Sequence, residues 1–158
     1  MQNNLQKALN RCYFFLKFRP RTEKEIKRFL FEKSAKYKLN KKTIDILLSK
    51  LKSQGYVNDK KFVDWFVLKR STRKPKSSFL IKRELLNHGV TIKDIEDYFD
   101  KNLFDEYSLA KRLLDKHRFG WLNIEAEKRK IKAQNTLLRA GFSFDIIKRA
   151  VEEFEKNY

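Results

Sequence analysis

Hydrophobic residues recur at intervals of three and four along most of the chain, the spacing that gives an α-helix one apolar face. One such segment runs from Leu5 to Leu16 and another from Ile44 to Leu51. Between them, Thr22 followed by Glu25 is a capping-box pattern, in which each side chain satisfies a free amide at the start of a helix. We therefore predict three helices in the first fifty-odd residues.

The same pattern begins again after a turn. Gly55 is suited to end a helix in the left-handed conformation, and Asn58 is suited to cap the next one. Pro75 favours the first turn of a further helix that ends at Gly89, and Thr91 favours the start of another. The sequence therefore predicts a second set of three helices.

A third set closes the chain, with a helix after Phe104, a long helix from about Asn123 to Leu138, and a last helix through Phe154. An ungapped alignment at an offset of 52 residues places Gly89 on Gly141 and indicates that the second and third sets are repeats. The first set fits this register only if it carries an insertion within residues 31–43.

These patterns predict an all-α protein made of three tandem three-helix repeats, covering residues 1–56, 57–103 and 104–158. Four glycines and two prolines among 158 residues are few for a β-protein, which needs many turns. A repeat of about fifty residues buries its apolar faces poorly alone, so we expect stacking into an elongated, curved array. A compact bundle of the same helices is the alternative.

Charge adds the main functional clue. The 38 Lys and Arg residues exceed the 20 Asp and Glu residues by 18. Three segments contain no acid: residues 1–22, 65–83 and 128–144. A surplus of this size causes self-repulsion unless a polyanion offsets it, which favours binding to nucleic acid or to an acidic assembly. A solvated, lysine-rich surface without a partner is the simpler interpretation.

The cations predicted to contact a polyanion lie mostly in the acid-free segments. They are Arg19, Arg21, Lys69, Arg70, Arg73, Lys74, Lys76, Lys82, Arg83, Arg118, Lys128, Arg129, Lys130, Lys132 and Arg139. Within the central segment, Arg70, Arg73, Lys74 and Lys76 surround Pro75, and we expect them to project together as the main electrostatic contact.

The sequence contains few candidates for catalytic residues. His88 is expected to cap a helix C-terminus, His117 to pack at the edge of the core, and Cys12 to be a buried, inert thiol. Trp121 is expected to pack between repeats, with a contact to a base or a partner as the alternative. No phosphate loop or metal-ligand spacing occurs, so the sequence indicates neither an enzyme nor a cofactor or metal.

Three segments of the chain are distinctive: GYVNDKKF at 55–62, KRELLNHGV at 82–90 and LLRAGFSFDII at 137–147. They resemble segments of the RecX family, the regulatory proteins of the RecA recombinase. The resemblance extends over nearly the whole chain and keeps the order of three repeats. The chain departs from the family pattern at Asn58, where two adjacent acids are usual, and before Pro75, where the usual glycine is missing.

The resemblance implies a protein that lies in the groove of the RecA filament on single-stranded DNA and inhibits its recombinase and co-protease activities. We accordingly expect a cytoplasmic monomer that contacts RecA and single-stranded DNA, with double-stranded DNA as a further candidate and no membrane partner. No apolar run of membrane-spanning or signal-peptide type occurs in the chain. An independent helical DNA-binding protein is the alternative, and an RNA- or ribosome-associated factor is a third.

Overall fold

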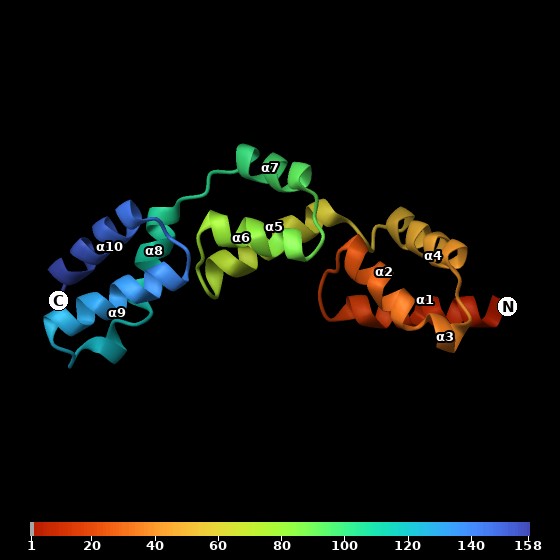
Figure 1. Ribbon diagram of the computed structural model, residues 1–158, viewed down its shortest axis with the longest axis horizontal. Helices are drawn as coiled ribbons and strands as arrows, with labels where there is room; N and C mark the ends of the chain where they lie inside the picture. Colours follow the sequence, from red (N-terminus) through yellow and green to blue (C-terminus); the bar gives the residue numbers. More distant parts are fainter. Residues whose placement is uncertain (1) are drawn as a thin grey trace. The chain divides into compact units, whose positions relative to one another are not determined.

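A computed structural model describes residues 2–158, and in this range the secondary structure is entirely helical, which confirms the predicted class. The helices are, in chain order, α1 (Gln2–Lys17), α2 (Glu23–Glu32), α3 (Ser34–Tyr37), α4 (Lys41–Ser53), α5 (Asp59–Thr72), α6 (Ser78–Asn87), α7 (Ile92–Lys101), α8 (Glu106–Asp115), the 3₁₀ helix η1 (Phe119–Trp121), α9 (Ala126–Arg139) and α10 (Phe144–Lys156). Figure 1 labels them along the ribbon.

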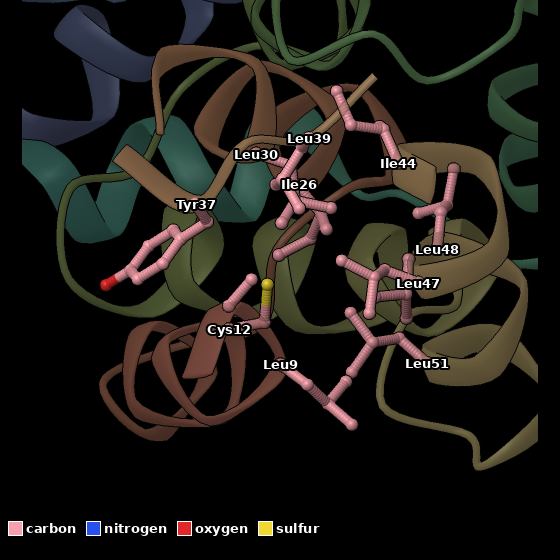
Figure 2. Packing of buried hydrophobic residues seen from close by; sticks show 12 residues of the cluster. Leu9, Cys12, Ile26, Leu30, Tyr37, Leu39, Ile44, Leu47, Leu48 and Leu51 are labelled. Atoms are coloured by element: carbon pink, nitrogen blue, oxygen red, sulfur yellow. The ribbon is translucent and has the colours of Figure 1, made fainter. Parts of the chain in front are cut away.

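The first three-helix set forms a core of its own, in which α1 and α2 pack against each other and against α4. Leu9, Cys12, Ile26, Leu30 and Leu51 are all buried there, and Figure 2 shows their side chains converging from the three helices. Because these residues follow the predicted three-and-four spacing, the sequence pattern places the core correctly.

The insertion expected within residues 31–43 contains the short helix α3, which the sequence pattern did not predict. It ends at Lys38, which adopts the left-handed conformation with φ 52°. The buried side chains of Tyr37 and Leu39 then join the first core. The insertion therefore adds a helical turn and two core residues to the first set.

A second core lies among α8, α9 and α10, which pack pairwise against one another. Leu114, Ala133, Leu137 and Ala150 are completely buried in it. The long helix α9 begins at Ala126, three residues later than predicted. This third set is a three-helix unit, as the hydrophobic spacing indicated.

The contacts of the whole chain form two compact units, residues 1–65 with 85–98 and residues 66–84 with 99–158. The middle set of helices therefore contributes to both units. The division into repeats at residues 56/57 and 103/104 stays a prediction.

A recurring junction explains why the middle set is shared. In the first unit, the hydroxyl of Thr22, at the start of α2, donates to the carbonyl of His88, just after α6 (2.6 Å). In the second unit, the amide of Ser77, just before α6, donates to the carbonyl of Ala140, just after α9 (2.9 Å). His88 and Ala140 are 52 residues apart, so the offset found in the sequence identifies equivalent positions.

Local capping follows the sequence closely. The capping box of Thr22 and Glu25 is present at the start of α2, and the side chains of Asn58 and Thr91 accept from amides three residues on. Pro75 is the exception, because α6 begins at Ser78 and Pro75 is a fully buried residue of the preceding turn. Ser77 caps α6 in its place, accepting from the amide of Leu80 (3.3 Å).

Candidate nucleic-acid interface

Several of the predicted contact cations form hydrogen bonds, ion pairs or contacts with aromatic rings within the fold. Arg19 donates to both carboxylate oxygens of Glu25 (2.5 and 3.1 Å) and to the carbonyl of Pro20. The guanidinium of Arg21 lies 3.8 Å from the centroid of the Phe15 ring, and burial, followed by the nearby charge of Arg19, lowers the pKa of Arg21. Both arginines therefore hold the turn between α1 and α2.

Arg129 and Arg118 are occupied in the same way near the C-terminus. Arg129 is buried, donates to both oxygens of Glu155 (2.9 and 2.7 Å), and lies 3.8 Å from the ring centroid of Tyr158. Its hydrogen bonds with Glu155 raise its pKa above the usual value. Arg118 donates to Asp115 (2.8 Å) and to the carbonyl of Asn157. We therefore remove both arginines from the candidate contact surface.

The central group around Pro75 divides into two kinds of residue. Arg70 donates to Glu84 at 2.6 Å and lies over the ring of Phe66, while Lys76 forms an ion pair with the other oxygen of Glu84. Their charges are thus balanced by one acid, contrary to the expectation that all four central cations project together. Arg73 and Lys74 are exposed and belong to no ion pair within residues 2–158.

The remaining predicted cations lie on the surface to different degrees. Lys82 is half-buried with its ammonium 4.8 Å from the centroid of the Phe99 ring, and Lys69 is also half-buried. Lys128 and Lys130 form exposed pairs with Glu125 (3.6 Å) and Glu127 (3.0 Å), a kind of contact that binds a charge only weakly. Among the predicted contact cations, those that are exposed and form no ion pair within residues 2–158 are Arg73, Lys74, Arg83, Lys132 and Arg139.

Two cations that the sequence analysis missed lie beside Arg73 and Lys74. Arg112 of α8 donates to the carbonyl of Ser71 (3.0 Å), and Lys116 donates to the carbonyls of Thr72 and Arg73 (3.0 and 2.6 Å). We call Arg73, Lys74, Arg112 and Lys116 the α5 corner. No sequence signal marked Arg112 and Lys116, because they come from a segment of mixed charge and join the corner only through folding.

The chemistry of this corner suits a phosphate backbone. Arg112 and Lys116 satisfy free carbonyls at the C-terminus of α5, where the helix dipole favours positive charge. Arg73 and Lys74 extend from the same turn into solvent. The corner thus combines two fixed cations with two exposed ones, an arrangement that attracts anions without a pocket of defined shape.

The cysteine and the two histidines considered as catalytic candidates are all engaged in contacts within the fold. Cys12 is completely buried, and burial raises the pKa of its thiol to about 12. His88 places Nδ1 at 3.5 Å from Glu25, and His117 stacks on Trp121 with ring centroids 4.7 Å apart. Trp121 also packs edge-on against Phe154, so it lies against the core of α8, α9 and α10 and not between repeats as expected.

Residues 2–158 contain neither a metal-ligand cluster nor a helix suited to span a membrane. No group of three or more His, Cys, Asp or Glu side chains in this range is arranged to hold a metal ion. None of the helices described combines the length and the apolar character required for a membrane span.

Taken together, these observations define a class: a basic, all-α protein of tandem helical repeats with exposed cations at an inter-helix corner. Comparison with known proteins is more specific. Residues 105–151 match the family model described as RecX, third three-helix domain. This match lies within the last three-helix set, α8 to α10.

Curated proteins are similar to most of the chain. Regulatory protein RecX of Bacillus cereus (strain AH820) and its namesake from Bacillus thuringiensis (strain Al Hakam) are each 29% identical over 157 residues, covering 96% of this chain and 55% of the relative. The chain thus spans about half the length of the curated relatives it matches.

Two solved structures share the fold. A crystal structure of RecX from Lactobacillus salivarius aligns with a TM-score of 0.73 at 23% identity and covers 99% of both chains. A second crystal structure of regulatory protein RecX aligns with a TM-score of 0.70, also at 23% identity, over 94% of this chain and 73% of the other.

Proposed function

We propose that this protein regulates RecA by binding in the groove of the RecA filament on single-stranded DNA, where it inhibits recombinase and co-protease activities. The proposal rests on similarity to proteins named regulatory protein RecX, together with the basic surface described above. In this proposal the protein is a cytoplasmic monomer and acts by binding, without catalysis or a cofactor.

The α5 corner is the observation that carries the proposal. It lies at the end of α5, where the backbone carbonyls of Ser71, Thr72 and Arg73 are held by cations of α8. Because those cations are fixed by the fold, positive charge at the corner does not have to be ordered when a polyanion binds. A filament of RecA on DNA is a polyanion of this kind and presents its charge along a groove.

The direct test removes the exposed charges that have no internal role. In the triple variant Arg73→Gln, Lys74→Gln, Arg83→Gln, stability should change by less than about 0.5 kcal/mol because the three side chains are exposed. Its binding to RecA filaments, measured by co-sedimentation across a salt series, should weaken. The slope of the logarithm of the binding constant against the logarithm of the salt concentration should become less steep by about two to three.

A matched control removes the same charge elsewhere. Lys41→Gln, Lys42→Gln, Lys50→Gln neutralises three exposed lysines of α4 and should leave filament binding within about twofold of the parent. Equal binding by the parent and the first triple variant at every salt concentration would show that Arg73, Lys74 and Arg83 are only solvated and do not contact the filament.

The same experiment separates the proposal from independent DNA binding. Binding to bare DNA should fall about a thousandfold between about 50 and 200 mM salt if about six phosphates are neutralised. A filament complex should retain a protein contact that is less sensitive to salt. If RecA adds nothing to binding at any salt concentration, the independent DNA-binding function replaces the proposed one.

A further inference from the structure

Helix α1 presents an exposed stripe that the folding of the chain does not use. Lys7, Arg11, Phe14 and Phe18 are separated by four, three and four residues, so they lie on one side of the helix, with Phe18 directly after its last turn. We call these four residues the α1 stripe. Leu9 and Cys12 on the opposite side are buried in the first core.

The two rings of the stripe are open to solvent, although phenylalanine usually favours burial. Phe14 is 52% exposed and Phe18 is 68% exposed. Their centroids are 5.0 Å apart with an interplanar angle of 82°, so the edge of one ring meets the face of the other. This arrangement holds the two rings in fixed positions while most of their surface stays accessible to a partner.

The charged residues of the α1 stripe are both positive. The guanidinium of Arg11 lies 5.4 Å from the centroid of Phe14, and Lys7 extends the stripe by one more turn. No acid occurs before Glu23 in the sequence. The stripe therefore offers two aromatic faces and two cations with no carboxylate among them.

Two other exposed phenylalanines, Phe79 (66%) and Phe119 (84%), also have basic neighbours in the sequence, so the feature that marks the α1 stripe is its pair of rings in contact beside two cations. Phe31 (73%) and Phe144 (80%) have acidic neighbours instead. A partner that is anionic and contains flat rings would distinguish the α1 stripe from Phe31 and Phe144. Single-stranded nucleic acid has both properties, because its phosphates pair with cations while its unpaired bases stack on aromatic side chains.

We propose that the α1 stripe is a stacking platform for the unpaired bases of single-stranded DNA. Phe14 and Phe18 receive the bases, and Lys7 and Arg11 contact the neighbouring phosphates. A base in a duplex already stacks on its neighbours, so the platform selects single strands. The inference adds a direct DNA contact to the proposed function and is tested without RecA, so the two can fail separately.

The test compares ring removal with charge removal, using fluorescence anisotropy of a labelled oligo-dT strand and of a duplex of equal length. Phe14→Leu, Phe18→Leu keeps the apolar character and removes the rings. Its affinity for oligo-dT should fall at least about tenfold, with an unchanged salt slope, because stacking does not depend on counterion release. Lys7→Gln, Arg11→Gln should instead reduce the salt slope by about two.

Controls make the result specific. Phe31→Leu, Phe144→Leu should bind oligo-dT like the parent, and circular dichroism should show all variants to be folded. The proposal is overturned if the Phe14→Leu, Phe18→Leu variant binds oligo-dT as tightly as the parent, or if the parent does not prefer single strands to the duplex. The proposal is also overturned if the Phe14→Leu, Phe18→Leu variant loses binding to anionic lipid vesicles but not to oligo-dT. That result would assign the α1 stripe to a membrane surface.

Discussion

Glu25 is the residue on which the polar contacts of the first junction converge. Its carboxylate accepts from Arg19 and from the amide of Thr22, and it lies 3.5 Å from Nδ1 of His88. Burial alone would raise its pKa, but hydrogen bonds from His88, Arg19 and Thr22 outweigh burial and lower the pKa to about 2. The ionised carboxylate therefore stabilises the contact between α2 and the end of α6.

This environment predicts a specific pH dependence. Because the pKa of Glu25 is depressed from 4.5 to about 2 in the folded chain, its contribution is fully present above about pH 4.5 and is lost as the pH falls towards 2. Glu25→Gln should lower the free energy of unfolding at neutral pH by about 2–3 kcal/mol. Urea denaturation should show this difference narrowing below about pH 4.5.

Glu32→Gln is the control, because Glu32 pairs with Arg28 only at an exposed surface. A difference between Glu25→Gln and the parent that stays the same down to about pH 2 would refute the assignment.

Cys12 supports a second prediction at this scale. The thiol is completely buried and burial raises its pKa to about 12; in Figure 2 its sulfur points into the cluster. The native protein should therefore react with a thiol reagent at about pH 8 only as fast as it opens, and denaturant should accelerate labelling by orders of magnitude. Prompt stoichiometric labelling of the native chain would contradict this.

Arg129 shows what a run of basic residues conceals. Lys128, Arg129, Lys130 and Lys132 look alike in a count of charges, but Arg129 precedes Ala133 by four residues and Leu137 by eight. Those two residues are buried, so helical spacing places Arg129 on the inner face of α9. The inward position of Arg129 could therefore have been predicted from the sequence. The pairing of Arg129 with Glu155, 26 residues later, could be known only from the fold.

At the scale of the elements, the junction glycines limit how closely helices approach. Gly141 has φ 84°, and a Cβ atom there would lie 2.5 Å from Cγ of Leu80 and 2.6 Å from Oγ of Ser77. Gly55 has a similar φ of 76°, but a Cβ atom would meet nothing within 4 Å. The two positions therefore share backbone strain and differ in packing.

Alanine at each position separates the two effects. Gly55→Ala should cost about 1 kcal/mol of unfolding free energy, the usual penalty of a left-handed non-glycine residue. Gly141→Ala should cost clearly more, about 2–4 kcal/mol, because Leu80 and Ser77 must also move. Thermal or urea denaturation of the two variants measures the difference, and equal costs would show that the junction has room for a side chain.

Helix positions were predictable because spacing and caps are local properties. The start of α6 was misplaced since Pro75 satisfies the rule for a first helical turn but is instead buried before the helix. The helix α3 was missed because four residues give too short a pattern to recognise. The α5 corner could not be predicted from the sequence either, because Arg112 and Ser71 are 41 residues apart.

At the scale of the whole molecule, the sharing of the middle helices between the two compact units links the repeats through equivalent contacts. Thr22 meets the carbonyl of His88, and Ser77 meets that of Ala140. The first junction is reinforced by charged groups around Glu25. At the second, Gly141 packs against Leu80. The two junctions thus use carbonyls at equivalent positions and differ in the donor, which is the side-chain hydroxyl of Thr22 in one and the backbone amide of Ser77 in the other.

We have proposed that this basic helical repeat protein binds RecA assembled on single-stranded DNA. The decisive measurement is co-sedimentation of the parent chain with RecA filaments, beside the same DNA without RecA, at near-physiological salt. We expect the protein to pellet with the filament and to remain there at a salt concentration that releases it from DNA alone. Equal release from filament and bare DNA across the salt series would contradict the proposal.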